Sequence, residues 1–378
     1  MLWLKLILFL DENKNHIKIK MEIPRLIKII IFLCLSTGTL YLLIWVSLKE
    51  ILPLLEKEFT TFWILFPFLF FLSLGIITFL SSKISEILYT YIYIIVFTFF
   101  GHIVNSFTCC LTLLLIKLFT NINYTIELLL SIILPIILTI YGVINARNTK
   151  VDKITLHYPK LKGRKKTICH LSDLHLGAVY QREFVQKIVI KIKEIAPDVV
   201  VITGDMCDGS LKVKLNWLEP FDSLSIPILY ITGNHEQIHG KDPMIEIINQ
   251  TSIKHIGSEV FKFDNINFIG IDYEYNLKTR LIEIMPSNNS NPNILLCHVP
   301  QLKPKDLEKY NIFLFLAGHT HGGQIFPFHP FVIAANACFN GLYEENGHYV
   351  YVSPGVGSWG PPMRIGSHST IGVINIEK

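Results

Sequence analysis

The stretch Val199-Val200-Val201-Ile202-Thr203-Gly204-Asp205 joins an uninterrupted apolar run to a single carboxylate. A short run of β-branched residues without polar alternation is typical of a strand that is buried on both faces. The glycine that follows it allows a sharp exit from the strand. The stretch therefore predicts a buried strand with Asp205 at its carboxyl end.

Similar apolar runs lie on both sides of this strand. They cover Thr167–Ser172, Ile228–Thr232, Phe268–Ile271, Ile294–Cys297 and Phe313–Ala317. Helical spacing of apolar residues separates some of them, over Glu183–Ile195 and again over Met244–Gln250. Because strands alternate with helices, we expect an α/β domain over residues 167–378.

Side chains that bind metal ions follow five of these runs. They occur in Asp173-Leu174-His175, at Asp205, in Gly233-Asn234-His235-Glu236, at His298 and in Gly318-His319-Thr320-His321. In α/β domains, ligands collect at the carboxyl ends of the strands. The set supplies enough oxygen and nitrogen ligands for two divalent ions, and a two-metal site of this kind is suited to cleaving phosphate esters.

The local spacing indicates how the ligands divide. Side chains at positions i and i+2 of an extended segment share a face, so Asp173 and His175 can bind one ion. Asp205 has two carboxylate oxygens and can bridge two ions, whereas Asn234 offers a neutral carbonyl oxygen to the second. Nitrogen and oxygen ligands without thiolate suit Mn, Fe, Zn or Mg, and we expect Mn(II) to support activity.

Taken together and in this order, the motifs resemble the calcineurin-like metallophosphoesterase superfamily over about Thr167 to Glu377. Three further segments, Ser172–Gly177, Gly318–Gln324 and Gly355–Arg364, are similar to its bacterial membrane-anchored branch. The resemblance implies a β-sandwich flanked by helices and a bridging hydroxide that attacks phosphorus in line.

The resemblance also implies a role for each matching residue. The first metal would be held by Asp173, His175 and His321, the second by Asn234, His298 and His319, and Asp205 would bridge the two. His235 would not bind metal but would stand near the leaving oxygen, as a general acid or a stabiliser of the transition state. An imidazole suits that role near neutral pH.

Two further polar residues are candidates for the site. Arg364 ends a Gly/Pro-rich loop and is either a phosphate-recognition residue or a surface charge. Asp208 either orients His235 or caps a turn. By strand parity, His170 faces away from Asp173 and is expected to pack in the core.

The N-terminal part of the chain is apolar enough to cross a membrane. The mean hydropathy is +0.43 and the chain has 25 Phe, and most of this excess lies before Asn145. Four stretches reach the ~20 residues that a span needs, at about 29–48, 59–80, 87–116 and 128–144. A turn at His102–Asn105 would divide the third stretch and give five spans.

Basic residues predict the orientation of these spans. Lys and Arg flank the block on both sides, which places both flanks in the cytoplasm and agrees with an even number of spans. We therefore expect a cytoplasmic segment 1–25, a membrane domain 26–146, a basic linker 147–166 and a cytoplasmic catalytic domain in a multi-pass membrane protein. Met21 is an alternative start to Met1.

Composition argues against other classes of protein. A net charge of +4 without a stripe of basic and aromatic residues does not favour a nucleic-acid binder. The seven cysteines have no metal-binding spacing. The expected partners are the lipid bilayer and a phosphate-ester or lipid-linked substrate, and nothing in the sequence indicates a protein partner.

The expected function is that of a membrane-bound, metal-dependent phosphohydrolase acting on phosphate ester or pyrophosphate bonds, with a phosphorylated or nucleotide-linked lipid as a candidate substrate. A narrower alternative is a UDP-diacylglucosamine-type pyrophosphatase of lipid A synthesis. A different class is a non-catalytic membrane sensor that uses the phosphoesterase fold, and the presence of Asn234 and His235 argues against it.

Overall fold

The structure is a computed structural model, and it describes residues 84–117, 119–159, 161, 163–273, 276–285 and 291–378. The predicted N-terminal segment 1–25 and the predicted spans at 29–48 and 59–80 lie outside the described residues. The chain divides into two compact units, Met1–Ile92 with His102–Ile137 and Tyr93–Gly101 with Leu138–Lys378.

Two long apolar helices precede the α/β domain. Helix α4 covers Glu86–Lys117 and is unbroken at His102–Asn105, so the alternative of a turn there is wrong. Helix α5 covers Tyr124–Arg147 and contains the predicted span at 128–144. Both are long and apolar enough to cross a membrane. The described residues thus contain two candidate spans of the four that the sequence predicts.

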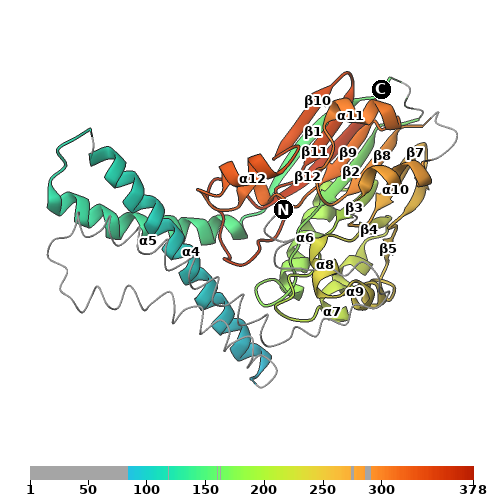
Figure 1. Ribbon diagram of the computed structural model, residues 1–378. Coiled ribbons are helices and arrows are strands. Elements are labelled where there is room, and N and C mark those ends of the chain that lie inside the picture. The colour runs from blue at the N-terminus through green and yellow to red at the C-terminus, as the bar shows by residue number, and fades with distance from the viewer. Residues whose placement is uncertain (1–83, 118, 160, 162, 274–275, 286–290) are drawn as a thin grey trace, which may run out of the picture. The chain divides into compact units, whose positions relative to one another are not determined.

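The α/β domain is built on two mixed sheets of six strands each (Figure 1). The first has the order β1-β12-β2-β3-β4-β5, with β1 Lys150–His157, β12 Thr370–Glu377, β2 Lys166–Leu171, β3 Val199–Thr203, β4 Ile228–Ile231 and β5 Ile253–His255. The second has the order β10-β11-β9-β8-β7-β6, with β10 Gly341–Glu345, β11 His348–Val352, β9 Leu314–Ala317, β8 Asn293–Cys297, β7 Ile266–Ile271 and β6 Glu259–Phe263.

Helices and short 3₁₀ turns connect the strands. They are α6 Arg182–Ile195, α7 Leu215–Leu218, η1 Glu219–Ser223, α8 Asn234–His239, α9 Lys241–Ile248, α10 Leu277–Ile284, α11 Pro304–Leu307, η2 Glu308–Tyr310, η3 His321–Gly323 and α12 His329–Ala335. The predicted strands and the two predicted helices are confirmed, with ends that differ by a few residues.

Parallel pairing aligns the ends of the central strands. In the first sheet, β2 pairs with β3 and β3 pairs with β4, both in parallel. In the second sheet, β8 and β9 are parallel as well. The carboxyl ends of neighbouring strands therefore lie together at one edge of each sheet, and the loops that carry the polar motifs leave from those edges.

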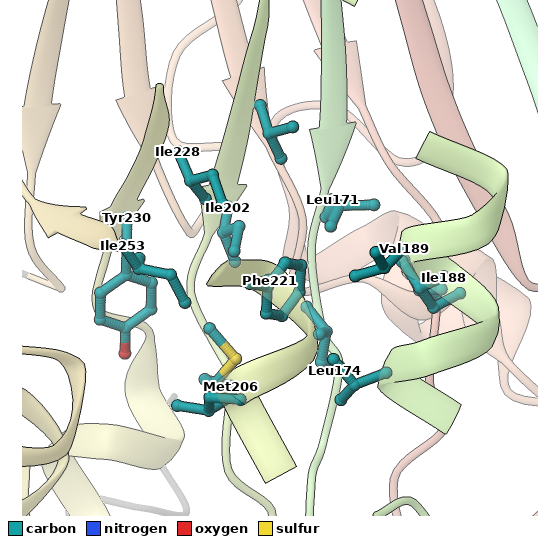
Figure 2. Close-up of a cluster of buried hydrophobic side chains, with 14 of the residues drawn as sticks. Leu171, Leu174, Ile188, Val189, Ile202, Met206, Phe221, Ile228, Tyr230 and Ile253 are labelled. Atoms are coloured by element: carbon teal, nitrogen blue, oxygen red, sulfur yellow. The ribbon is translucent and has the colours of Figure 1, made fainter. Parts of the chain in front are cut away.

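Three apolar clusters hold the layers together. One lies between the two sheets, where Val201 and Leu229 of the first sheet share a cluster with Leu296 and Leu316 of the second. A second packs helix α6 and Phe221 on the outer face of the first sheet (Figure 2). A third packs α10 on the outer face of the second sheet, through Leu281. The domain is therefore a β-sandwich flanked by helices.

The segment 147–166, which the sequence pattern predicts to be a basic linker, contains a strand, β1. Residues Lys150–His157 pair in parallel with β12, from Lys150 opposite Thr370 to His157 opposite Glu377. Only Leu156 of this strand is buried, because β1 is the edge of its sheet. One buried residue among charged ones leaves no apolar run, so the α/β domain begins earlier than its sequence pattern suggests.

Candidate metal centre

All seven predicted metal ligands come from loops at the strand ends. Asp173 and His175 follow β2, and Asp205 follows β3. Asn234 opens helix α8 after β4. The other three come from the second sheet, where His298 follows β8 and His319 and His321 follow β9. The centre thus lies where the edges of the two sheets meet, and its position requires both sheets to be in place.

A left-handed backbone conformation turns most of these side chains toward one another. The φ angle is positive at Asp173 (54°), His175 (49°), Asp205 (53°), His319 (72°) and His321 (51°). The prediction that Asp173 and His175 share a face because their segment is extended is therefore wrong, since the backbone is left-handed at both residues. Their side chains nevertheless lie close together. Non-glycine residues in this conformation cost about 1–3 kcal/mol each and cluster at functional sites.

The first ligand group consists of Asp173, His175 and His321. The Nε2 atoms of the two histidines are 3.0 Å apart. Asp173 Oδ1 lies 3.4 Å from His321 Nε2 and 3.9 Å from His175 Nε2. Three ligand atoms of suitable chemistry therefore converge on a space that could hold one cation.

The second group consists of Asp205, His298 and His319, with Asn234 beside them. Asp205 Oδ2 lies 3.2 Å from His298 Nε2, and Asn234 Oδ1 lies 2.9 Å from His319 Nδ1. The same Asp205 oxygen is 3.8 Å from His175 Nε2 in the first group. Asp205 Oδ2 thus stands between the two groups, where a bridging carboxylate oxygen would be needed.

The hydrogen bonding of His298 is that of a metal ligand. Its Nδ1 donates to the carbonyl oxygen of Thr203 at 2.7 Å, so that in the neutral form of the ring the lone pair lies on Nε2. The residue is fully buried, and the described residues offer Nε2 no hydrogen bond of suitable geometry, although Asp205 Oδ2 lies 3.2 Å away. Metal-binding histidines are commonly oriented by such a bond from the other ring nitrogen. The residues present therefore fit a pair of divalent ions, through oxygen and imidazole ligands without thiolate.

Burial sets the charge state of most imidazoles in the centre. It lowers the pKa of His175 and His321 well below the usual range, with neighbouring His321 and Arg364, respectively, adding to the effect. Burial, with His298 nearby, lowers the pKa of His319 to about 4. These three rings are thus neutral near pH 7, which is the form of histidine that binds metals.

Asp205 and His298 shift each other's pKa in opposite directions. Burial alone would raise the pKa of Asp205, but His298 beside it holds that pKa well below its usual range. Burial alone would lower the pKa of His298, but Asp205 raises it to about 10. The proton on His298 must leave before Nε2 can bind a cation, so metal binding and proton release are coupled at this pair.

Glu236 holds two of the ligand loops together, a role that the sequence did not reveal. Its Oε2 accepts hydrogen bonds from the backbone N–H groups of Asp205 (3.0 Å) and Gly233 (2.7 Å), and its Oε1 accepts one from Cys207 (3.0 Å). The side chain is fully buried. The detectable signal is its place at the third position of helix α8, where Glu commonly caps the preceding backbone.

Arg364 is not placed as a substrate ligand. Its guanidinium is fully buried and donates to the carbonyl oxygens of Pro354 (2.7 Å), Gly355 (3.2 Å), Gly357 (2.5 Å) and His321 (3.1 Å). Because these carbonyls occupy its donors, the side chain positions the loop of His321 rather than presenting itself to a phosphate. Of the two alternatives for Arg364, a phosphate-recognition residue and a surface charge, the second is wrong because the side chain is buried.

Of the two alternatives for Asp208, the turn cap agrees with the structure. Asp208 Oδ1 accepts hydrogen bonds from Ser210 N (2.7 Å) and Ser210 Oγ (2.6 Å). Nδ1 of His235, by contrast, has no hydrogen-bond partner in the part of the chain that the structure describes. His170 bonds Thr203 Oγ1 at 2.8 Å and is fully buried, so the expectation that it packs in the core is confirmed.

His235 lies beside the two ligand groups and is 8% exposed, whereas His175 and His298 are fully buried. Its backbone N–H donates to Asp205 Oδ1 at 2.9 Å, and its Nε2 is 4.0 Å from Asp205 Oδ2. Its ring contacts Trp359 edge-on, with centroids 5.8 Å apart, and Trp359 is 57% exposed. A molecule that reaches the centre past Trp359 would therefore meet His235.

Comparisons with known proteins agree with this fold. The calcineurin-like phosphoesterase family matches residues 166–323. An uncharacterized metallophosphoesterase of Helicobacter pylori (strain J99) is 33% identical over 60% of this chain and 64% of its own length. One of Aquifex aeolicus is 30% identical over 65% of this chain and 98% of its own length. A transmembrane protein with metallophosphoesterase domain from Danio rerio is 32% identical over 65% of this chain and 61% of its own length.

The fold and the paired ligand groups are those of a metallophosphoesterase domain, with Asp/His groups that could hold metal ions. The chain belongs to the calcineurin-like phosphoesterase family. The match spans slightly less than two thirds of the Helicobacter protein's length. Relatives from Danio rerio and Bos taurus are named as transmembrane proteins, and the described part of this chain has two helices long and apolar enough to cross a membrane.

Proposed function

We propose that this protein is a membrane-bound phosphohydrolase that binds two divalent metal ions through the two ligand groups. Asp173, His175 and His321 would hold one ion, Asn234, His298 and His319 the other, and Asp205 would bridge them. The observation that carries this proposal is the position of Asp205 Oδ2, 3.8 Å from a ligand nitrogen of the first group and 3.2 Å from one of the second. Mn(II) is the metal that we propose for activity.

When bound, such a pair of ions activates water as a nucleophile and neutralises phosphoryl oxygens. The protein's own residues position the substrate and move the proton. His235 stands beside the ligand groups, with its ring 4.7 Å from that of His175. From there its imidazole protonates the oxygen of the departing group, a step to which a positioned histidine contributes about 10²–10⁴-fold in rate.

For the substrate, we propose a phosphate ester or pyrophosphate that is linked to a lipid. Helices α4 and α5 support this proposal, because an enzyme held at a bilayer meets amphiphilic substrates there at high local concentration. We further propose that the membrane domain crosses the bilayer several times and that the α/β domain faces the cytoplasm, on the basis of the basic residues that flank the apolar block.

The test uses the detergent-purified full chain with Mn(II). Hydrolysis of bis-p-nitrophenyl phosphate, p-nitrophenyl phosphate and a nucleotide-linked diacylglucosamine is compared in the wild type, Asp205→Ala and Asp242→Ala. Asp242 is an exposed carboxylate in helix α9 and serves as the matched control. We expect turnover in the wild type and the control, and its loss in Asp205→Ala. The preferred compound distinguishes a diesterase from a pyrophosphatase, and bound metal without turnover of any compound would favour a sensor.

A further inference from the structure

Helix α12 and the turn before it expose an apolar surface, which we call the phenylalanine ridge: Phe326, Phe328, Phe331 and Ile333. Phe331 is 71% exposed and Ile333 is 52% exposed. None of the seven residues of α12 is buried. Figure 1 shows α12 at the margin of the domain, where it does not cover the face of either sheet. An apolar surface that a protein keeps exposed in this way marks an interaction site.

The phenylalanine ridge is fastened to the last turns of helix α5. The backbone N–H of Phe326 donates to the carbonyl oxygen of Ile365 at 2.9 Å. Ile365 in turn packs on Gly142 of α5, where a Cβ atom would lie 3.0 Å from Ile365 Cγ1. Gly142 precedes the basic end of the helix at Arg147 by five residues, which is about 7.5 Å along the axis. The ridge is therefore attached close to the end of an apolar helix.

A basic hollow lies at the same end of helix α5. It has a volume of about 260 Å³ and is lined by three basic residues, Arg147, Lys187 and Lys191, by one acidic residue, Glu194, and by apolar residues that include Phe184 and Ile190. Basic residues close to a bilayer attract anionic head groups, at ~1 kcal/mol each. An apolar surface combined with basic residues is the composition of protein surfaces that lie in a membrane interface.

We propose that the lipid bilayer itself covers the phenylalanine ridge. In this arrangement Phe331 and Ile333 enter the boundary between head groups and acyl chains, and Lys187 and Lys191 meet anionic head groups. Near its end, α5 also exposes the apolar side chains of Ile140 (56%) and Ile144 (62%), on the side of the helix away from Gly142. The proposal rests on α5 being a membrane span.

This docking would bring the metal centre to the membrane surface. Phe326 follows His321 by only five residues. Between them, the Gln324 side chain donates a hydrogen bond to the carbonyl oxygen of Trp359 and accepts one from its backbone N–H, at 2.9 Å each. Trp359 also contacts His235. A lipid-linked phosphate could therefore reach the centre without leaving the interface. This last consequence also rests on the proposed function.

The test places a nitroxide spin label at Phe331→Cys in the full chain, reconstituted into phosphatidylcholine vesicles with and without phosphatidylglycerol. The measured quantity is the collision rate of the spin label with oxygen, which concentrates in lipid, compared with its collision rate with a water-soluble nickel chelate. Ile282→Cys is the matched control, because Ile282 is a 62% exposed aliphatic residue on α10. Wild-type protein treated in the same way measures labelling of the native cysteines, of which Cys169, Cys207, Cys297 and Cys338 are buried.

We expect the label at position 331 to meet oxygen and to be shielded from the nickel chelate, whereas the label at position 282 meets the chelate freely. If the label at position 331 met the nickel chelate as often as the control label at position 282 does, the proposal would be overturned. Shielding from both reagents would also overturn it, because it would mean that protein covers the ridge, from another part of this chain or from a second copy.

The basic hollow has its own test in the same vesicles. Phosphatidylglycerol should increase the shielding of the label at position 331 from the chelate, and Lys187→Gln combined with Lys191→Gln should abolish that increase. An increase of the same size in the double variant would remove the hollow from the proposed surface. These readouts need no turnover, so their failure is distinguishable from a failure of the phosphohydrolase proposal.

Discussion

The Nε2 atoms of His175 and His321 lie 3.0 Å apart, and burial lowers the pKa of both rings. The two residues are 146 positions apart in the sequence and come from loops of different sheets. One neutral ring can donate its Nε2–H to the Nε2 lone pair of the other, whereas with both Nε2 lone pairs free the same two atoms could bind one cation. The fold therefore holds these atoms in an arrangement that a metal ion would stabilise.

Loss of the Glu236 carboxylate should lower activity without removing any predicted metal ligand. Glu236→Gln replaces one of the two carboxylate oxygens by an NH₂ group, which leaves backbone N–H groups of Asp205, Gly233 or Cys207 without an acceptor. Removing such outer hydrogen bonds typically costs about 10–100-fold in metal affinity or activity. The measurement is kcat together with the Mn(II) dissociation constant.

The exposed Glu246→Gln on helix α9 is the control for this substitution and should behave as the wild type. If Glu236→Gln retained both wild-type kcat and wild-type metal affinity, Glu236 would not position the loops as we infer.

Asp272 should make stability depend on pH in the acid range. Burial would raise the pKa of Asp272, but hydrogen bonds from His255, Lys241 and the N–H of Thr232 hold it below its usual range. A carboxylate whose folded pKa is depressed contributes stability above its unfolded pKa of about 3.9, and this contribution is lost as the pH falls through the folded pKa. Asp272→Asn should therefore unfold more readily at pH 7, by about 2 kcal/mol.

The measurement for Asp272 is the thermal unfolding of detergent-solubilised protein at several pH values, followed by circular dichroism. The difference in Tm between wild type and Asp272→Asn should shrink as the pH falls below about 4. A difference that stays constant down to the lowest pH at which the protein folds would show that the charge of Asp272 does not carry the effect.

Asn145 should connect the end of helix α5 to the metal centre. Its Nδ2 donates to the carbonyl oxygens of Arg364 (2.9 Å) and Ser367 (2.8 Å), and Arg364 in turn donates to that of His321. Asn145→Leu leaves these buried acceptors unpaired, which costs about 1–3 kcal/mol. We expect a lower Tm and a reduced kcat on a soluble diester, because the loop of His321 loses support.

Asn148→Leu, at an exposed position three residues further on, is the matched control for Asn145. Wild-type kcat in Asn145→Leu, with only the Tm lowered, would mean that the end of α5 stabilises the domain without influencing the centre.

Much of the fold and of the site could be predicted because the relevant signals are local in sequence. Strand β3 is an unbroken apolar run, and Asp205 directly follows it. Burial on both faces of a strand leaves this mark whatever the rest of the chain does. The ligand residues were recognisable for the same reason, since each stands at the end of such a run.

Other features depend on tertiary contacts that no local pattern carries. The burial of Arg364 results from carbonyls of Pro354, Gly355, Gly357 and His321 that only the folded loops bring together. Strand β1 is exposed along one edge, so its sequence shows no apolar alternation. The left-handed backbone at Asp173 and His319 is set by packing of the loops. The exposure of Phe331 cannot be predicted either, because an apolar residue ordinarily suggests a core.

We infer that Asp205 links two ligand groups into one binuclear centre, and electron paramagnetic resonance of the Mn(II)-loaded full chain would show whether the two ions are coupled. Metal analysis should give two Mn(II) ions per chain, and the spectrum should show an exchange-coupled pair. The coupled signal should disappear in Asp205→Ala and persist in the exposed control Asp242→Ala. A spectrum of isolated Mn(II) in the wild type, with a single ion per chain, would contradict the account.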